Sequence, residues 1–407
     1  MGKDMDRCGH WLSRGRVRLY SFLMFGSFLM FSIGFVRYSN LVETNSYTAI
    51  TDFTVFWSVS HLALMGHASD AYEVSRLDEI VRMVAPDEVG KSPHGWFYPP
   101  NFFLTILPLG LLSYFQAYLV FMLATLSGYV LVLQRIIRGG DALWCLAGFS
   151  GVWINLLFSQ NGFLTAALAG AALLNLERRP VLAGVFIGLL SIKPHLVLLF
   201  PVALIVIAAW RTLFTAVFVA IVFIVASTSV LGADTFLAWL HSLGLARKLM
   251  ETDAGRAYWS NMPTMFAFLR LLDVPVMVSY MGHAVVALTA VATLWKVWLS
   301  DSRPLRGAAF TTATLLVSPY LMVYDLTWLA LPIAWLTKLG LENGWLRGER
   351  EVLVAASLLP LLLILVAKVV PLQIGPWVLL ALLWVVLRRA RMMARHGVEG
   401  NGLKFPP

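Results

Sequence analysis

Charged residues are scarce in this chain, and their scarcity sets its class. Asp, Glu, Lys and Arg make up 13% of the 407 residues, whereas hydrophobic residues make up 59% and the mean hydropathy is +0.76. A soluble globular domain carries about 25% charged residues. The low charge therefore excludes an ordinary soluble domain and predicts an integral membrane protein.

Cysteine is almost absent, and the common cofactor motifs are missing. Cys8 and Cys145 form neither a metal-ligand spacing nor a disulfide pattern. The sequence has no Walker loop, dinucleotide fingerprint or nucleophile elbow, and no zinc-site spacing. His61, His67 and His283 lie among apolar residues and are interpreted as structural. We therefore expect no cofactor and no obligatory metal ion.

Long uncharged runs indicate many membrane spans. A helix needs about 20 apolar residues to cross the hydrocarbon layer. The sequence predicts an all-α polytopic membrane protein, a bundle of about 12 transmembrane helices with a range of about 10 to 13. The predicted spans lie near residues 19–36, 115–134, 142–158, 162–176, 181–192, 195–210, 212–231, 274–295, 305–320, 322–337, 352–367 and 369–388.

The basic residues gather at the two ends of the chain. Residues 1–18 hold five basic and two acidic residues, and residues 388–407 hold five basic residues and one acidic residue. The positive-inside rule places both ends in the cytoplasm, which requires an even number of crossings. We divide the chain into a basic tail (1–18), one transmembrane domain (19–388) and a second basic tail (389–407). Charge placed in this way does not indicate a nucleic-acid partner.

Two long segments are predicted to lie outside the membrane. Residues 38–97 carry three basic and eight acidic residues and include amphipathic helices near 54–66 and 74–85. A second outer loop is predicted at about 232–273. Residues 98–113, which contain Pro108 and Gly110, are expected to form a re-entrant or interfacial segment.

Asp52 is the leading candidate for a catalytic group. Its neighbours from Thr51 to Trp57 are apolar or hydroxylic, and no Lys or Arg lies within ten residues. Burial without a nearby cation raises the proton affinity of a carboxylate, which suits a general base. The alternative is an ordinary carboxylate that caps a helix or lies in a loop.

Other polar residues fall at the same predicted outer boundary, where an ionisable group is costly and usually functional. Each residue also has a purely structural explanation. Tyr98 could be an interfacial aromatic ring, and Gln160 and Asn161 could cap helix ends. Lys193 could extend towards lipid head groups, and Asp325 could pair with a helix dipole. The candidate residues are Tyr98, Gln160, Asn161, Lys193, Asn261, Tyr324 and Asp325, and His195 falls at the same boundary in the stretch Lys193-Pro194-His195.

Six short motifs follow one another within about residues 45–335. They are Asp52-Phe53, Gly66 through Tyr72, Phe97-Tyr98-Pro99-Pro100, Gln160-Asn161-Gly162, Lys193-Pro194 and Ser318-Pro319. Their order and spacing resemble glycosyltransferase family 87, membrane enzymes of the GT-C superfamily that use polyprenyl-phosphate sugars. The resemblance implies a GT-C-like fold and an active site on the outer face of the bacterial inner membrane.

The resemblance also implies a reaction and roles for the candidate residues. A hexose, with mannose as the best-supported sugar, would pass from a polyprenyl-phosphate donor to a lipid or glycan acceptor with inversion, and Asp52 would act as the base. Membrane lipids would be the other partners. Candidate donor or phosphate contacts are Lys193, Arg256, Tyr98, Asn161 and Gln160. Candidate acceptor contacts or a second carboxylate are Asp325, Tyr324 and Asn261.

The chain departs from the family pattern after the Ser-Pro motif. Mannosyltransferases of this type tend to carry histidine there, whereas this chain has Tyr324-Asp325. Two other functions compete with sugar transfer: a transporter or flippase of lipid-linked saccharides, and a non-catalytic membrane assembly partner. A transporter needs ionisable residues in the middle of its spans, and these are nearly missing.

Overall fold

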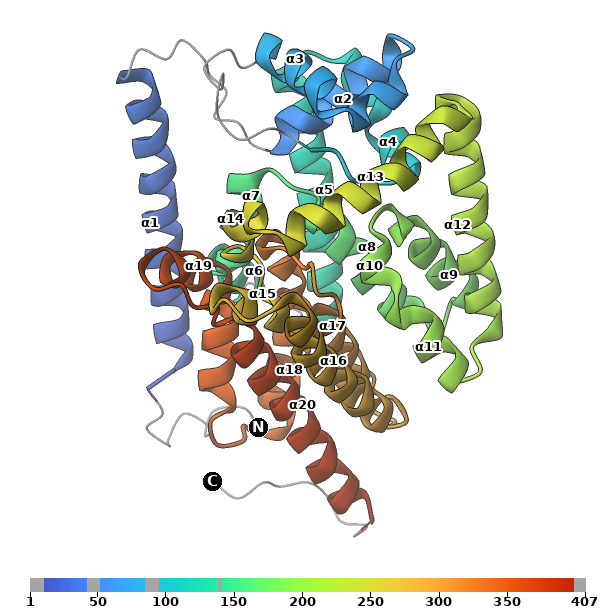
Figure 1. The fold of residues 1–407 in the computed structure, drawn as a ribbon. Coiled ribbons are helices and arrows are strands. Elements are labelled where there is room, and N and C mark those ends of the chain that lie inside the picture. The colour runs from blue at the N-terminus through green and yellow to red at the C-terminus, as the bar shows by residue number, and fades with distance from the viewer. Residues whose placement is uncertain (1–10, 42–51, 85–94, 138–140, 399–407) are drawn as a thin grey trace.

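The computed structural model describes residues 11–41, 52–84, 95–137 and 141–398, and within these ranges all regular structure is helical. Figure 1 shows a bundle with a small group of helices at one end. We call this group, which comprises α2, η1, α3 and α4, the cap. The expectation of a helical membrane protein is confirmed.

The elements follow one another as α-helices and short 3-10 helices (η). The N-terminal part holds α1 (Arg14–Leu41), α2 (Asp52–Leu64), η1 (Ala68–Tyr72), α3 (Val74–Val84), α4 (Pro100–Ile106), η3 (Leu107–Leu111) and α5 (Tyr114–Ile136). The middle part holds α6 (Asp141–Ala147), α7 (Ser150–Phe158), α8 (Gly162–Asn175), α9 (Pro180–Leu189), η4 (Leu190–Ile192), α10 (Pro194–Val197), α11 (Leu199–Val206), α12 (Trp210–Leu231), α13 (Ala233–Glu251) and η5 (Asp253–Gly255). The C-terminal part holds α14 (Arg256–Trp259), α15 (Met265–Leu271), α16 (Val276–Trp298), α17 (Arg303–Val317), η6 (Val323–Leu329), α18 (Ala330–Asn343), α19 (Glu349–Val369) and α20 (Gly375–Val398).

Four described helices are long and apolar enough to cross a membrane: α5, α12, α16 and the Glu349–Ala367 part of α19. Other apolar helices are shorter. For example, α8 has 14 residues, and at about 1.5 Å per residue it is shorter than the hydrocarbon thickness of about 30 Å. The count of about 12 spans therefore stays a prediction.

Several predicted spans are interrupted in the structure. The span expected at 142–158 is divided between α6 and α7, and that at 195–210 is divided between α10 and α11. The span expected at 369–388 begins later, at Gly375, and α20 continues to Val398. The predicted basic tail from residue 389 is thus helical at its start.

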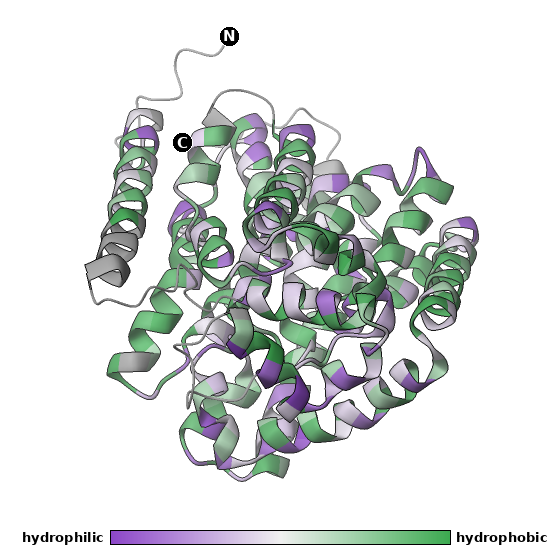
Figure 2. Cartoon of the chain, turned by 90° about the horizontal axis from the view of Figure 1, so that it is seen from above, coloured by the Kyte–Doolittle hydropathy of each residue, from purple (hydrophilic) through white to green (hydrophobic). Residues whose placement is uncertain are grey.

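Apolar side chains cover much of the outer surface of the bundle. On α12, for example, Phe214 and Phe218 are 68% and 66% exposed. Figure 2 shows that apolar residues extend over most of the length of the helices. Because such a surface is unfavourable in water, it is the surface expected against lipid tails.

The two ends of the described bundle lie at the same end of the molecule. In Figure 1 the first residues of α1 and the last residues of α20 lie opposite the cap. This arrangement agrees with an even number of crossings. Which end faces the cytoplasm stays a prediction.

Helix α2 is a core element and not a surface helix. The amphipathic helix predicted near 54–66 begins at Asp52, and it buries residues on all sides, including Phe53, Phe56 and Val59. The Phe56 ring makes edge contacts with Phe102 of α4 and with Phe121 of α5 in the bundle. Burying one such aromatic side chain contributes roughly 1.5–3 kcal/mol. The cap is therefore fixed to the bundle by aromatic packing.

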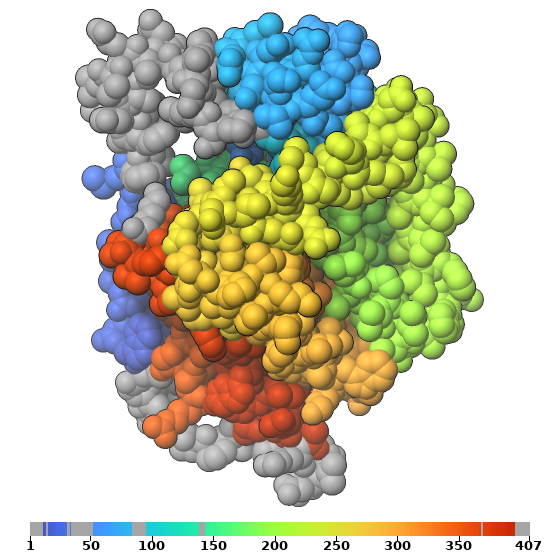
Figure 3. All heavy atoms as spheres, in the orientation of Figure 1, coloured from blue at the N-terminus to red at the C-terminus, as the bar shows by residue number. Residues whose placement is uncertain are grey.

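The predicted second outer loop is also helical. Helix α13 packs against α4, α12 and η1, and Figure 3 shows residues 233–271 as a ridge across the front of the molecule. Trp259, Met262 and Phe266 form a small separate core there, against which Tyr280 and Tyr320 pack. This core joins the ridge to α16 and to the segment before η6.

Glu349 and Arg389 form a buried ion pair between α19 and α20, with side chains 0% and 2% exposed. We expect Glu349→Gln to lower the free energy of unfolding by about 3–5 kcal/mol, because it leaves the guanidinium charge buried without a counter-charge. Thermal unfolding of the protein in detergent measures the effect. Glu79→Gln is the control, since the Arg76–Glu79 pair is more than half exposed and such pairs contribute little. Equal melting temperatures for both variants would contradict the prediction.

Candidate active site

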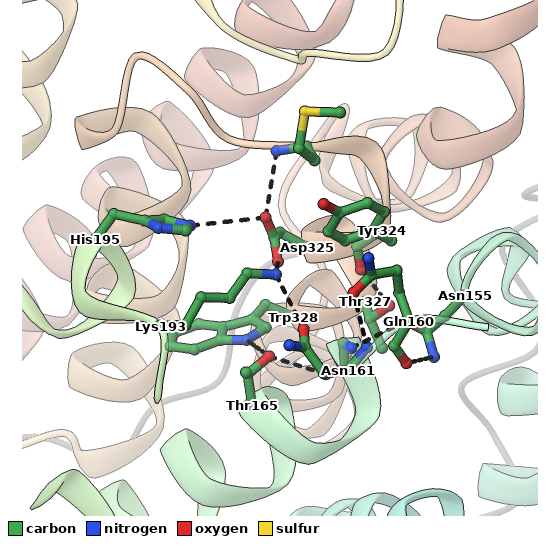
Figure 4. A network of polar contacts seen from close by, with 12 residues as sticks. Asn155, Gln160, Asn161, Thr165, Lys193, His195, Tyr324, Asp325, Thr327 and Trp328 are labelled. Carbon is green, nitrogen blue, oxygen red and sulfur yellow. Dashed lines mark hydrogen bonds and ion pairs between the residues drawn. The ribbon is translucent and has the colours of Figure 1, made fainter. Parts of the chain in front are cut away.

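Most of the polar residues predicted at one membrane boundary lie in one network in the structure, and Figure 4 shows five of them: Gln160, Asn161, Lys193, Tyr324 and Asp325. Their elements are far apart in the sequence. Asp52 begins α2, and Tyr98 precedes α4. Gln160 and Asn161 lie between α7 and α8. Lys193 lies between η4 and α10, and Tyr324 and Asp325 lie in η6. The structure thus brings these residues together in one place, whereas their roles stay a prediction.

Asp52 is held by a chain of hydrogen bonds. Gln160 Nε2 donates to Asp52 Oδ2 at 2.7 Å. Gln160 Oε1 accepts from Tyr98 Oη at 2.9 Å and from the backbone N of Asn161 at 3.1 Å. Because both donors meet the amide oxygen, the amide nitrogen must point at Asp52. Gln160 therefore orients the carboxylate.

The position of Asp52 also follows from how α2 is anchored. Trp57 Nε1 donates to the carbonyl of Leu112 at 3.1 Å, and Ser60 Oγ donates to the carbonyl of Ile106 at 3.0 Å. Asp52 is the first residue of the helix, where the helix dipole favours a negative charge. A partly buried carboxylate is thus fixed at the edge of the cap.

The turn that carries Gln160 and Asn161 is built by Asn155 and Gly162. Helix α7 ends at Ser159, whose φ of 53° is left-handed. Asn155 Nδ2 donates to the Gln160 carbonyl at 3.0 Å, and Asn155 Oδ1 accepts from the backbone N of Gly162 at 3.0 Å. The side chain of Asn155 therefore closes the turn and aims Gln160 at Asp52.

Lys193 and Asp325 form a buried ion pair beside this chain. The Lys193 Nζ to Asp325 Oδ1 distance is 2.6 Å, and the side chains are 5% and 0% exposed. Lys193 Nζ also donates to Asn161 Oδ1 at 3.0 Å and lies 4.6 Å from the centre of the Tyr324 ring. Burying either charge without its partner would cost roughly several kcal/mol, so the two charges must be buried as a pair.

Asp325 is fixed by the packing of η6. Tyr129 Oη donates to the carbonyl of Thr327 at 2.9 Å, and Trp328 Nε1 donates to Thr165 Oγ1 at 3.1 Å. Asp325 Oδ2 accepts from the backbone N of Met322 at 3.2 Å and lies 3.8 Å from His195 Nε2. The Asp325 carboxylate thus pairs with Lys193, accepts a hydrogen bond at the start of η6, and faces His195.

Two tyrosines near Asp52 stay neutral. Burial, with added repulsion from Asp325 and Asp52, raises the pKa of Tyr98 far above its ordinary value. Burial and then the charge of Asp52 raise the pKa of Tyr258 in α14. Tyr98 is therefore a hydrogen-bond donor to Gln160. The negative charge of Asp52 also affects the pKa of Tyr258 in α14, which belongs to the ridge.

Some predicted residues lie away from this network. Arg256 is exposed and its Nη1 is 2.7 Å from Asp273 Oδ1. Asn261 meets the site through its backbone, because its carbonyl accepts from Val323 N at 2.8 Å. Its side chain has no contact with Asp52 or Lys193 among the described interactions.

Asn155 was not predicted, and His195 was predicted at the boundary without a role in the site. Asn155 looks like one polar residue in an apolar run, and nothing in the sequence indicates that it closes a turn. His195 stands two residues after Lys193, and its proximity to the candidate lysine was the available signal. No group of three His, Cys, Asp or Glu residues with the geometry of a metal site occurs in the described ranges.

The fold and the site define a helical membrane protein with a polar centre where its cap meets its bundle. The sequence model of glycosyltransferase family 87 matches residues 96–319, more than half of the chain. The chain belongs to glycosyltransferase family 87 and is a membrane glycosyltransferase. No curated protein and no solved structure matches it. The matched range includes Tyr98, Gln160 and Lys193, whereas Asp52 and Asp325 lie outside it.

Gly162 tests how tightly the turn is packed. A Cβ atom there would lie 2.4 Å from Asn155 Oδ1 and 2.6 Å from the Tyr324 carbonyl oxygen. We expect Gly162→Ala to destabilise the protein by about 1–3 kcal/mol through overpacking and to lower its melting temperature.

The matched control is Gly128→Ala in α5, where the nearest atom is the Ala167 Cβ at 3.7 Å. Alanine fits there and is the better helix former, so the melting temperature should stay the same or rise. If Gly162→Ala has the same melting temperature as the wild type, the turn is not as closely packed as the structure indicates.

Proposed function

We propose that this glycosyltransferase moves a hexose, with mannose as the leading candidate, from a polyprenyl-phosphate donor to a lipid or glycan acceptor. The observation that carries the proposal is the Gln160 hydrogen bond that fixes Asp52 beside the buried Lys193–Asp325 pair. One end of the site thus presents a carboxylate, and the other end holds the cationic groups. Such an arrangement suits proton removal at one end and binding of an anionic leaving group at the other.

In the proposed reaction Asp52 removes the proton of an acceptor hydroxyl as that oxygen attacks the anomeric carbon. The bond between the anomeric carbon and the phosphate oxygen breaks, and its electron pair stays on the phosphate. The products are the glycosylated acceptor, polyprenyl phosphate with one more negative charge, and a protonated Asp52. Attack opposite the leaving group inverts the anomeric carbon, so one carboxylate is enough.

The leaving phosphate needs positive charge more than it needs a proton donor. Lys193 is the buried ammonium of the site and supplies positive charge near the proposed donor end, while the Tyr98 hydroxyl donates to Gln160 beside it. Asn161 holds Lys193 through its amide oxygen. We propose no obligatory metal ion, and we place the acceptor near Asp52 and the ridge that carries Asn261. Arg256 stays a candidate for donor contacts from the ridge.

A transporter of lipid-linked saccharides is supported less well. The long apolar helices α5, α12 and α16 carry their Lys and Arg residues only in a terminal turn: Arg135, Arg211 and Lys296. Transport pathways need ionisable groups near the membrane centre. The polar residues gather instead where the cap meets the bundle.

Asp52→Asn tests the proposed base. We expect sugar transfer from polyprenyl-phosphate-mannose to fall by about 10²–10⁴-fold, since amide nitrogen cannot accept the proton. Mass spectrometry of the lipid product measures the rate. Asp234→Asn is the matched control, because Asp234 is an exposed acid in the first turn of α13. Full activity of Asp52→Asn would remove Asp52 from the mechanism.

The proposed location at the outer face of the inner membrane requires Lys193 and Arg306 to lie on opposite sides of the bilayer. We expect a reporter inserted after Lys193 to be active in the periplasm, and a reporter after Arg306 to be active in the cytoplasm. Alkaline phosphatase and green fluorescent protein fusions distinguish the two sides. A cytoplasmic reporter after Lys193 would overturn the proposed orientation.

A further inference from the structure

We propose that His195 is the residue that directly contacts the phosphate of the lipid donor, with Asp325 as the carboxylate that positions its ring. The proposal rests on the proposed function and deepens it. It assigns the anion-binding role to a residue outside the motifs from which that function was predicted. Most N–H donors of the Lys193 ammonium group are already bound to other groups of the protein.

Lys193 has little capacity left for a ligand. Its ammonium group has three N–H donors, and two of them meet Asp325 Oδ1 and Asn161 Oδ1. The same nitrogen lies over the rings of Tyr324 and Tyr98, at 4.6 Å and 5.8 Å from their centres. Its charge is thus balanced by Asp325 and enclosed by aromatic rings. A phosphate could reach it only if this packing opened.

His195 is the most exposed side chain of the same cluster, although its Nε2 atom, which faces Asp325, is itself buried. Its side chain is 33% exposed, whereas those of Lys193 and Asp325 are 5% and 0% exposed. In Figure 4 the imidazole ring and the Lys193 ammonium group approach the Asp325 carboxylate from different directions. A ligand that approaches the cluster therefore meets the histidine before it meets the lysine.

The ring nitrogen that faces Asp325 is held at a distance without a hydrogen bond. His195 Nε2 is 3.8 Å from Asp325 Oδ2, beyond hydrogen-bond range, and has no hydrogen-bond partner in the described structure. A small rotation of the ring would turn this nitrogen from the Asp325 carboxylate towards a bound phosphate.

An imidazole N–H donor at this point suits the charge that the reaction creates. When the bond from the anomeric carbon to the phosphate oxygen breaks, the phosphate gains one negative charge. A hydrogen bond from the His195 ring to that phosphate stabilises this charge without a transfer of the proton. The Lys193–Asp325 pair then acts as a support, since its two charges balance each other before the donor binds.

Binding of polyprenyl phosphate, the product that retains the phosphate, tests the proposal without sugar transfer. The full-length protein in nanodiscs is titrated with this lipid, and polyprenol, which lacks the phosphate, is the control ligand. We expect His195→Gln and His195→Asn to weaken polyprenyl phosphate binding by about 10–100-fold, the range for a lost hydrogen bond to a charged group. Polyprenol binding should stay unchanged.

A charge-retaining variant separates contact from structure. His195→Lys should bind polyprenyl phosphate more tightly than His195→Gln, because an ammonium group also binds phosphate. His241→Gln removes an exposed histidine of α13 and should bind like the wild type. Thermal unfolding of each variant confirms that the fold is kept.

Wild-type affinity in folded His195→Gln and His195→Asn would overturn the proposal. Equal loss of polyprenol binding would overturn it as well, because that result indicates a damaged site. Both binding results are independent of the activity of Asp52→Asn, which tests the proposed base. If Asp52→Asn is inactive while His195→Gln binds normally, the proposed reaction stands and the role of His195 fails. If Asp52→Asn is fully active while His195→Gln loses binding, the proposed base fails and the phosphate contact stands.

Discussion

The buried ion pair between Lys193 and Asp325 is the interaction on which the site depends. These residues are 132 positions apart in the sequence, yet their charges meet at 2.6 Å with almost no access to solvent. Loss of one partner of such a pair costs about 3–5 kcal/mol, because the other charge is left buried. The turn before α10 and the helix η6 must therefore come together before the site is complete.

The rest of the site is built outward from this pair. Asn161 binds Lys193 through its side chain and binds Gln160 through its backbone, so the pair is connected to the residue that orients Asp52. On the other side Asp325 faces His195. A carboxylate and an imidazole thus lie at the two ends of one network, and the proposed reaction uses them for the acceptor proton and for the phosphate.

Much of this arrangement could be predicted from the sequence, because hydropathy and charge act locally. The uncharged runs predict α5, α12 and α16 within a few residues, and the isolated acid at Asp52 belongs to the site. The pairings could not be predicted. Nothing near Lys193 indicates that Asp325 neutralises it, and nothing near Arg256 indicates that it pairs with Asp273. Such partners are set by helix packing over long sequence separations. The interruptions at α6–α7 and α10–α11 were missed for a related reason, since composition reports apolar length and not where a helix bends.

A structure of the full-length protein with polyprenyl phosphate bound is the most direct test of the two-ended site. The account predicts the phosphate within hydrogen-bond distance of the His195 ring, about 2.7–3.2 Å. It predicts that Asp52 stays bonded to Gln160 and faces the space where an acceptor hydroxyl would lie. A phosphate bound instead at Arg256 or on the outer surface of the bundle, with no contact to this network, would contradict the account.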